Sequence, residues 1–162
     1  MEEIAISLSG GGYRAAMFHL GTLSYLNRIL LPNGKNLLDV VNTISTISGG
    51  SITGLWYMMH VCKGEDIDTC FKNLFRILCN VDLPQSVMNS FLEENNTNDS
   101  LIRETIHFYD EVFFKGQTFG LLMDSVENKH IHHYSANGTD FSNGIAFRFQ
   151  ASRAIQNTKP EF

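Results

Sequence analysis

The pattern of apolar and polar positions predicts two strand–helix units in the first part of the chain. Residues 4–8 and 43–47 are short apolar or β-branched segments of the length expected for buried strands. Residues 15–30 carry apolar side chains at helical spacing, and residues 52–61 form a proline-free segment that also predicts a helix. A strand–helix–strand–helix order implies a parallel sheet with right-handed crossovers and packed helices. We therefore predict an α/β fold.

The later part of the chain predicts packing helices followed by a pair of strands. A helix is expected to begin at Asp66, with acidic residues in its first turn and an apolar stripe formed by Phe71, Leu74, Phe75 and Leu78. The remaining expected elements are helices over residues 86–92, 101–114 and 119–126, strands over 130–135 and 145–149, and a turn over 136–140. Residues 93–100 are expected to form a polar loop.

Length, charge and cysteine content argue against several classes of protein. The chain has 162 residues, which suits one domain, and its net charge of -5 argues against nucleic-acid binding. No apolar run approaches the ~18 residues of a membrane span, although apolar contact with a lipid surface stays open. Cys62, Cys70 and Cys79 form an odd set without C-x-x-C spacing, which indicates reduced thiols and a cytoplasmic location.

Glycine-rich corners follow both predicted strands. Ser48 stands at the second corner, between a β-branched strand and Gly49, where a tight turn would expose its hydroxyl beside helix amides. Gly10, Gly11 and Gly12 form the first corner. The carboxyl ends of parallel strands share one edge of the sheet, so we expect both corners to face a single site.

These residue types suit acyl transfer. Ser48 would be the nucleophile, and the amides of Gly49 and of Gly10, Gly11 and Gly12 would stabilise the oxyanion. Arg14 would brace the glycine corner or balance negative charge, although a simple surface position is the alternative.

The expected general base is missing from the pattern. The six histidines are His19, His60, His107, His130, His132 and His133, and none occupies a triad position downstream of an acid. His130 and His132 share a predicted strand face but lack a third metal ligand, so neither metal nor cofactor is expected.

Two other interpretations of the glycine corner remain open. The spacing Gly10-x-Gly12-x-x-Ala15 formally matches a dinucleotide fingerprint. That fingerprint needs an acid after the second strand, whereas the nearest acid, Asp39, precedes it. A purely structural glycine turn is the other alternative.

The motifs together resemble the patatin-like phospholipases and lipid acyl hydrolases. LSGGGYRAA at residues 8–16, with FHLG at 18–21, is similar to the family's oxyanion segment and following helix. STISGGSI at 45–52 is similar to its G-x-S-x-G elbow, with Thr46 in place of the first glycine, and NGTDF at 137–141 with Gly144 resembles a later N-A-T-D-L…G segment.

The resemblance implies a three-layer α/β domain, a lipid or phospholipid substrate, and a Ser48–aspartate dyad instead of a triad. The family's aspartate lies in an Asp-Gly motif that this chain lacks, and Asp39, Asp124 and Asp140 have no such context. We therefore expect residues 1–162 to be the amino-terminal part of one catalytic domain, inactive alone, with its aspartate beyond Phe162. The alternatives are a catalytically inactive binding or regulatory module of the same fold and a nucleotide-binding α/β domain.

Overall fold

A computed structural model describes residues 4–82, 85–86, 88–89, 92, 101–127 and 129–153 of the chain. Its strands are β1 (Ile4–Leu8), β2 (Val41–Ile47), β3 (His133–Asp140) and β4 (Ile145–Ser152). Its helices are α1 (Gly12–Leu26), η1 (Leu37–Val40), α2 (Gly49–Lys63), α3 (Ile67–Asn80), α5 (Leu101–Tyr109), η2 (Asp110–Phe114) and α6 (Gly120–Ser125). The expected helix and loop over residues 86–100 lie largely outside the described residues.

The four strands form one sheet in the order β1-β2-β3-β4. Strands β1, β2 and β3 are parallel, and β4 returns antiparallel to β3. This topology confirms the predicted α/β class with a mainly parallel sheet. The carboxyl ends of β1 and β2 therefore lie at the same edge, where each strand passes into a helix.

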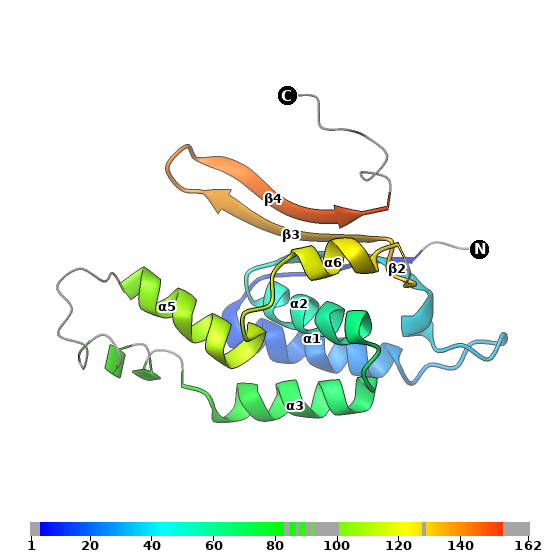
Figure 1. Cartoon of the computed structure of the whole chain (residues 1–162). Helices are drawn as coiled ribbons and strands as arrows, with labels where there is room; N and C mark the ends of the chain where they lie inside the picture. The colour runs from blue at the N-terminus through cyan, green and yellow to red at the C-terminus, as the bar shows by residue number, and fades with distance from the viewer. Residues whose placement is uncertain are drawn as a thin grey trace.

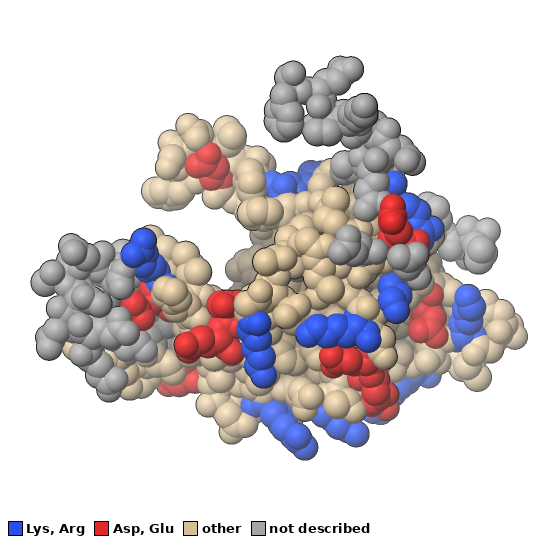
Figure 2. All heavy atoms as spheres, viewed as in Figure 1, with Lys and Arg blue, Asp and Glu red and all other residues tan. Residues whose placement is uncertain are grey.

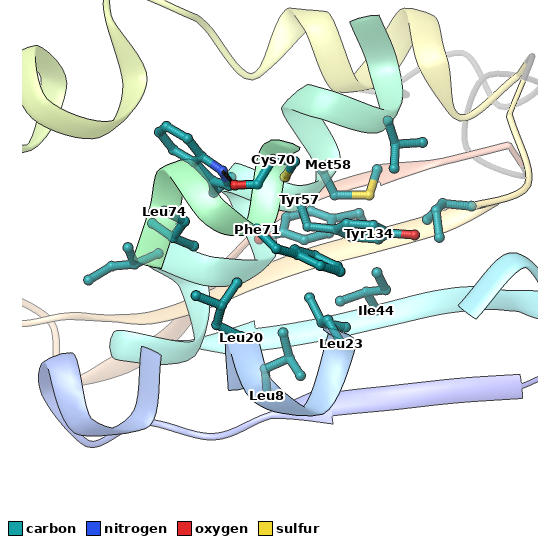
Figure 3. Close-up of a cluster of buried hydrophobic side chains, with 14 of the residues drawn as sticks. Leu8, Leu20, Leu23, Ile44, Tyr57, Met58, Cys70, Phe71, Leu74 and Tyr134 are labelled. Atoms are coloured by element: carbon teal, nitrogen blue, oxygen red, sulfur yellow. Dashed lines mark hydrogen bonds between the residues drawn. The ribbon is translucent and has the colours of Figure 1, made fainter. Parts of the chain in front are cut away.

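Helices α1, α2 and α3 pack together on one face of the sheet (Figure 1). Their buried side chains meet those of the strands in one apolar core, whose labelled members are shown in Figure 3. Leu8, Ile44 and Tyr134 contribute from β1, β2 and β3, and each is at most 2% exposed. This core holds the sheet edge and the starts of α1 and α2 in a fixed relation.

The opposite face of the sheet carries small polar side chains. The strand register aligns Ser7 with Ser45 and Ser45 with Ser135, and the Ser135 and Ser45 hydroxyls are hydrogen-bonded at 3.2 Å. Among the described residues, α1, α2 and α3 thus supply one helical layer. The second helical layer that the family resemblance implies remains an expectation.

The prediction for the carboxy-terminal strands was wrong in its boundaries. Residues 136–140 continue β3 instead of forming a turn, and the turn lies at residues 141–144. The Asn137-Gly138 pair suggested a turn, but Asn137 pairs with Arg148 and Gly138 with Phe147 in the ladder. The hairpin therefore extends several residues beyond the end of β2.

The predicted helix over 101–114 also differs from the structure. It changes from α to π geometry at Asp110 and ends at Lys115, which has a φ of 51°. Ile102 and Ile106, in the α-helical part, are 73% and 61% exposed, whereas Phe113 in the π turn is buried. The extra residue of the π turn rotates Phe113 into the core relative to the α-helical segment before it.

Candidate active site

Ser48 occupies a strained turn between β2 and α2. Its φ of 52° and ψ of -125° lie in a region that residues other than glycine rarely adopt. Its side chain is exposed, and its carbonyl accepts the Ser51 N–H at 2.8 Å in the first turn of α2. This is the conformation expected of a nucleophile elbow, with the hydroxyl presented at the sheet edge.

The glycine corner of residues 9–12, which we call the glycine loop, lies directly against this elbow. A Cβ built on Gly10 would be 3.1 Å from the Cβ of Ser48. A Cβ on Gly49 would overlap the Gly12 carbonyl oxygen, and one on Gly50 would overlap the Leu8 carbonyl oxygen. The two corners therefore meet at one site, and only glycine at positions 49 and 50 permits this approach.

His19 holds the glycine loop from α1. Its imidazole is 5% exposed, and its Nε2 donates a 2.9 Å hydrogen bond to the Ser9 carbonyl. The Ser9 hydroxyl lies 3.4 Å from the same nitrogen. The sequence pattern offers His19 only as one of six candidate bases and does not predict this positioning role. The available signal was its position in the predicted helix that directly follows the glycine corner.

Thr46, in place of the family's first elbow glycine, is buried in a hydroxyl network. Its Oγ1 donates to the Ser135 carbonyl at 3.1 Å, so it accepts from the hydroxyls of Tyr134 and Ser51, each at 3.0 Å. Gly54 leaves the space for the Thr46 methyl group, because a Cβ there would lie 2.5 Å from Thr46 Cγ2. Burial raises the pKa of Tyr134 far above its usual value, which keeps its hydroxyl protonated as a donor.

Asn137 supports the elbow from β3. Its Nδ2 donates to the Thr46 carbonyl at 2.9 Å and to the Ser45 hydroxyl at 3.0 Å. Arg148 Nε donates to Asn137 Oδ1 at 3.2 Å and so fixes the orientation of the amide. Asn137 thus supplies a hydrogen-bond donor to the Thr46 carbonyl, two residues before the strained Ser48.

Arg14 makes no hydrogen bond or ion pair within the described part of the chain, and its side chain is exposed. An exposed position is the alternative given for Arg14 in the sequence analysis, and His19 is the side chain that contacts the glycine loop. The roles of Arg14 in bracing the loop or in balancing negative charge stay predictions.

Of the three acids named in the sequence analysis, Asp39 and Asp140 have described side chains, and both are held in local turns. Asp39 forms a capping box at the start of η1, before the seven residues of β2, and so lies ~23 Å or more from Ser48 along the strand. Asp140 accepts from the side-chain amide of Asn143 and from the backbone N–H groups of Asn143 and Ser142, and these hydrogen bonds lower its pKa. The Asp124 side chain lies outside the described residues.

Two of the other histidines, His60 and His130, also have structural contacts. His60 Nδ1 donates to the Trp56 carbonyl at 2.8 Å, and its Nε2 lies 3.3 Å from Glu65. His130 contacts the Tyr57 hydroxyl at 3.3 Å, and it precedes β3 instead of lying within it. No group of His, Cys, Asp or Glu side chains in the described ranges could hold a metal ion.

Apolar side chains are exposed near the edge of the sheet at which Ser48 lies. The β3–β4 hairpin carries Phe141, which is 96% exposed, and Phe147 on β4, which is 48% exposed. Figure 2 shows the surface hollowed between this hairpin and α5. A groove of about 420 Å³ lies among α2, α5, η2 and α6, with Leu55, Ile106 and Phe119 in its walls. Within the described residues, none of the helices has the length and apolar character needed to cross a membrane.

The comparison with protein families agrees with this geometry. The model of the patatin-like phospholipase family matches residues 6–148. This match covers most of the chain, from the glycine loop to the hairpin, so the protein belongs to the patatin-like phospholipase family. Searches of curated proteins and of solved structures gave no match.

Proposed function

We propose that this protein is a serine lipid acyl hydrolase that cleaves fatty-acyl esters through an acyl-enzyme on Ser48. The observation that carries the proposal is the strained Ser48 turn in contact with the glycine loop. A serine with positive φ, placed against Gly10 and preceding Gly49, has both an exposed hydroxyl and nearby backbone amides. Membership in the patatin-like phospholipase family supports the same class of reaction.

In the proposed reaction, the Ser48 hydroxyl attacks the ester carbonyl and transfers its proton to a carboxylate. The resulting oxyanion is stabilised by the Gly49 N–H and by an N–H of the glycine loop, at Gly10, Gly11 or Gly12. The ester C–O bond then breaks, and the carboxylic acid returns the proton to the leaving alcohol. Water, deprotonated by the same carboxylate, hydrolyses the acyl-enzyme and releases a fatty acid with regeneration of Ser48.

The base in this proposal is an aspartate outside the described residues. Within the described residues, none of the six histidines is hydrogen-bonded to Ser48, and Asp39 and Asp140 are engaged elsewhere. A Ser–Asp dyad therefore explains Ser48 better than a histidine triad does. Residues 1–162 would supply the nucleophile and the oxyanion donors of that dyad.

The lipid character of the substrate is supported by the apolar surface next to Ser48. Leu55 lies seven residues along α2 from Ser48, a rise of ~10 Å, so an acyl chain bound to Ser48 could extend to the groove beyond it. Exposed Phe141 and Phe147 on the hairpin suit contact with the surface of a lipid aggregate. Such contact would be peripheral and apolar, because the net charge of -5 does not favour anionic membranes.

Ester hydrolysis by the full-length protein tests the proposal. We expect release of fatty acid from phosphatidylcholine vesicles and from p-nitrophenyl octanoate, with both activities abolished in Ser48→Ala. Ser142→Ala is the matched control, since this exposed hairpin serine should leave activity unchanged. A folded protein with no activity on either ester would indicate the alternative, a non-catalytic module that keeps the fold.

A further inference from the structure

A second apolar groove lies between α1 and α3, away from the elbow. Its volume is about 540 Å³, within the ~300–1,000 Å³ typical of small-molecule sites. Leu20 and Phe71 form its buried floor, and Phe75 stands at its side with 54% of its surface exposed. The groove reaches from Met17 on α1 to Arg28, two residues beyond the end of that helix.

Gly21 keeps this groove open. A Cβ built on Gly21 would meet no atom within 4 Å, so no packing contact requires glycine at this position. Glycine is unfavourable inside a helix by ~1 kcal/mol relative to alanine. The residue therefore costs helix stability and leaves a space that a longer side chain would fill.

Three cations surround the apolar floor. Arg28 on the α1 side and Lys72 and Arg76 on α3 line the groove, accompanied by one acid, Asp68. None of the three cations makes an ion pair or a side-chain hydrogen bond with another described residue. Figure 2 shows basic side chains along the lower edge of the molecule, where α3 runs in Figure 1. A positively charged rim is therefore present on a chain whose overall charge is -5.

We propose that the α1–α3 groove binds the anion of a fatty acid. The apolar floor between the helices suits one alkyl chain, and the unpaired cations at the rim suit its carboxylate. A neutral lipid would leave the cations unpaired, and a flat bilayer surface would not enter a groove between two helices. The charge and shape together thus favour a single-chain anionic amphiphile.

This site is separate from the proposed nucleophile. Gly12, which contacts the elbow, precedes Gly21 by nine residues, a rise of ~14 Å along α1. Binding in the groove does not rest on the proposed function. If Ser48 does release fatty acids, the groove would bind the product class of the reaction, and the rigid α1 would connect the two sites.

Displacement of a fluorescent fatty acid tests this proposal. The full-length Ser48→Ala protein is titrated with cis-parinaric acid, which is then displaced by decanoate or by decanol. We expect saturable binding and displacement by decanoate at a concentration at least tenfold lower than by decanol. Equal potency of the acid and the alcohol would overturn the proposed role of the cations.

Variants in the same background locate the bound molecule. Gly21→Leu should fill the groove and weaken binding at least tenfold, whereas Gly21→Ala should retain most of it. The double variant Lys72→Gln/Arg76→Gln should weaken decanoate binding by a similar factor, with Lys63→Glu on α2, which lowers the net charge by the same amount, as the control. Circular dichroism confirms folding of each variant. Unchanged binding in folded Gly21→Leu, or equal loss in Lys63→Glu, would overturn the proposal.

Discussion

Gly49 and Gly12 lie so close together that a methyl group on Gly49 would overlap the Gly12 carbonyl oxygen. One residue begins α2 and the other begins α1, so this contact joins the elbow to the glycine loop. The relative position of Ser48 and the candidate oxyanion donors is therefore set by backbone packing. Flexible side chains are not needed to bring the two corners together.

Gly49→Ala is expected to separate these two corners. Relief of the overlap requires a backbone shift, with a loss of ~1–3 kcal/mol in the free energy of unfolding, as for other overpacked sites. Gly21→Ala is the matched control, because it adds the same methyl group to α1 in open space and should stabilise the helix by up to ~1 kcal/mol. Urea denaturation of both variants measures the difference. Equal stability of the two would contradict the assigned contact.

Thr46→Val is expected to destabilise the protein although it conserves side-chain shape. The substitution leaves the buried Tyr134 hydroxyl and the partly buried Ser51 hydroxyl without their common acceptor, which costs ~1–3 kcal/mol. Adding Tyr134→Phe should recover part of this loss, because the unpaired hydroxyl is then removed. A double-mutant cycle by chemical denaturation measures the coupling. Strict additivity of the two substitutions would show that the hydroxyls do not interact.

We expect His19→Leu to lower kcat for ester hydrolysis at Ser48, with only a small effect on the free energy of unfolding. The Ser9 carbonyl loses its donor, so the glycine loop is no longer held against the elbow. Misplaced catalytic groups typically cost ~10²-fold in rate, and we expect a loss of this order in kcat for a soluble ester. His19→Gln, whose amide can donate to the same carbonyl, should restore most of kcat. Equal kcat values in the leucine and glutamine variants would rule out the positioning role.

Lowering the pH should decrease the free energy of unfolding, in part through His130. Burial is the main cause that lowers the pKa of its imidazole below the ordinary value of 6.5. The unfolded chain therefore binds a proton at His130 more readily, and stability falls as the pH drops through 6.5 toward the folded pKa. Urea unfolding at pH 7.5 and 5.5 should show a larger loss in the parent protein than in His130→Gln. The same loss in both would contradict this assignment.

Local sequence patterns predicted the parts of the site that depend on neighbouring residues. The strand before Ser48 and the glycines after it specify a tight strand-to-helix turn, and the glycine loop follows a strand in the same way. Parallel pairing of β1 and β2 then brings both corners to one edge, as expected. The patterns could not specify the contacts of Gly49 and Gly50, because those depend on the packing of α1 against α2.

Residues distant in the chain account for most of what the patterns missed. Thr46 and Tyr134 are 88 positions apart and meet only because β3 pairs with β2. Asn137-Gly138 has the composition of a turn, yet the hydrogen bonds of Asn137 to the elbow strand keep it in β3. The π turn after Tyr109 is equally invisible in apolar spacing, since it arises where Phe113 reaches the core.

Covalent labelling of Ser48 tests the central claim most directly. The full-length protein is incubated with an alkyl fluorophosphonate, and the intact mass and the modified peptide are determined by mass spectrometry. We predict one adduct, located on Ser48 and absent from Ser48→Ala, while Ser142→Ala is labelled like the parent protein. A folded protein that forms no adduct, or that is labelled equally after Ser48→Ala, would contradict the assignment of Ser48 as the nucleophile.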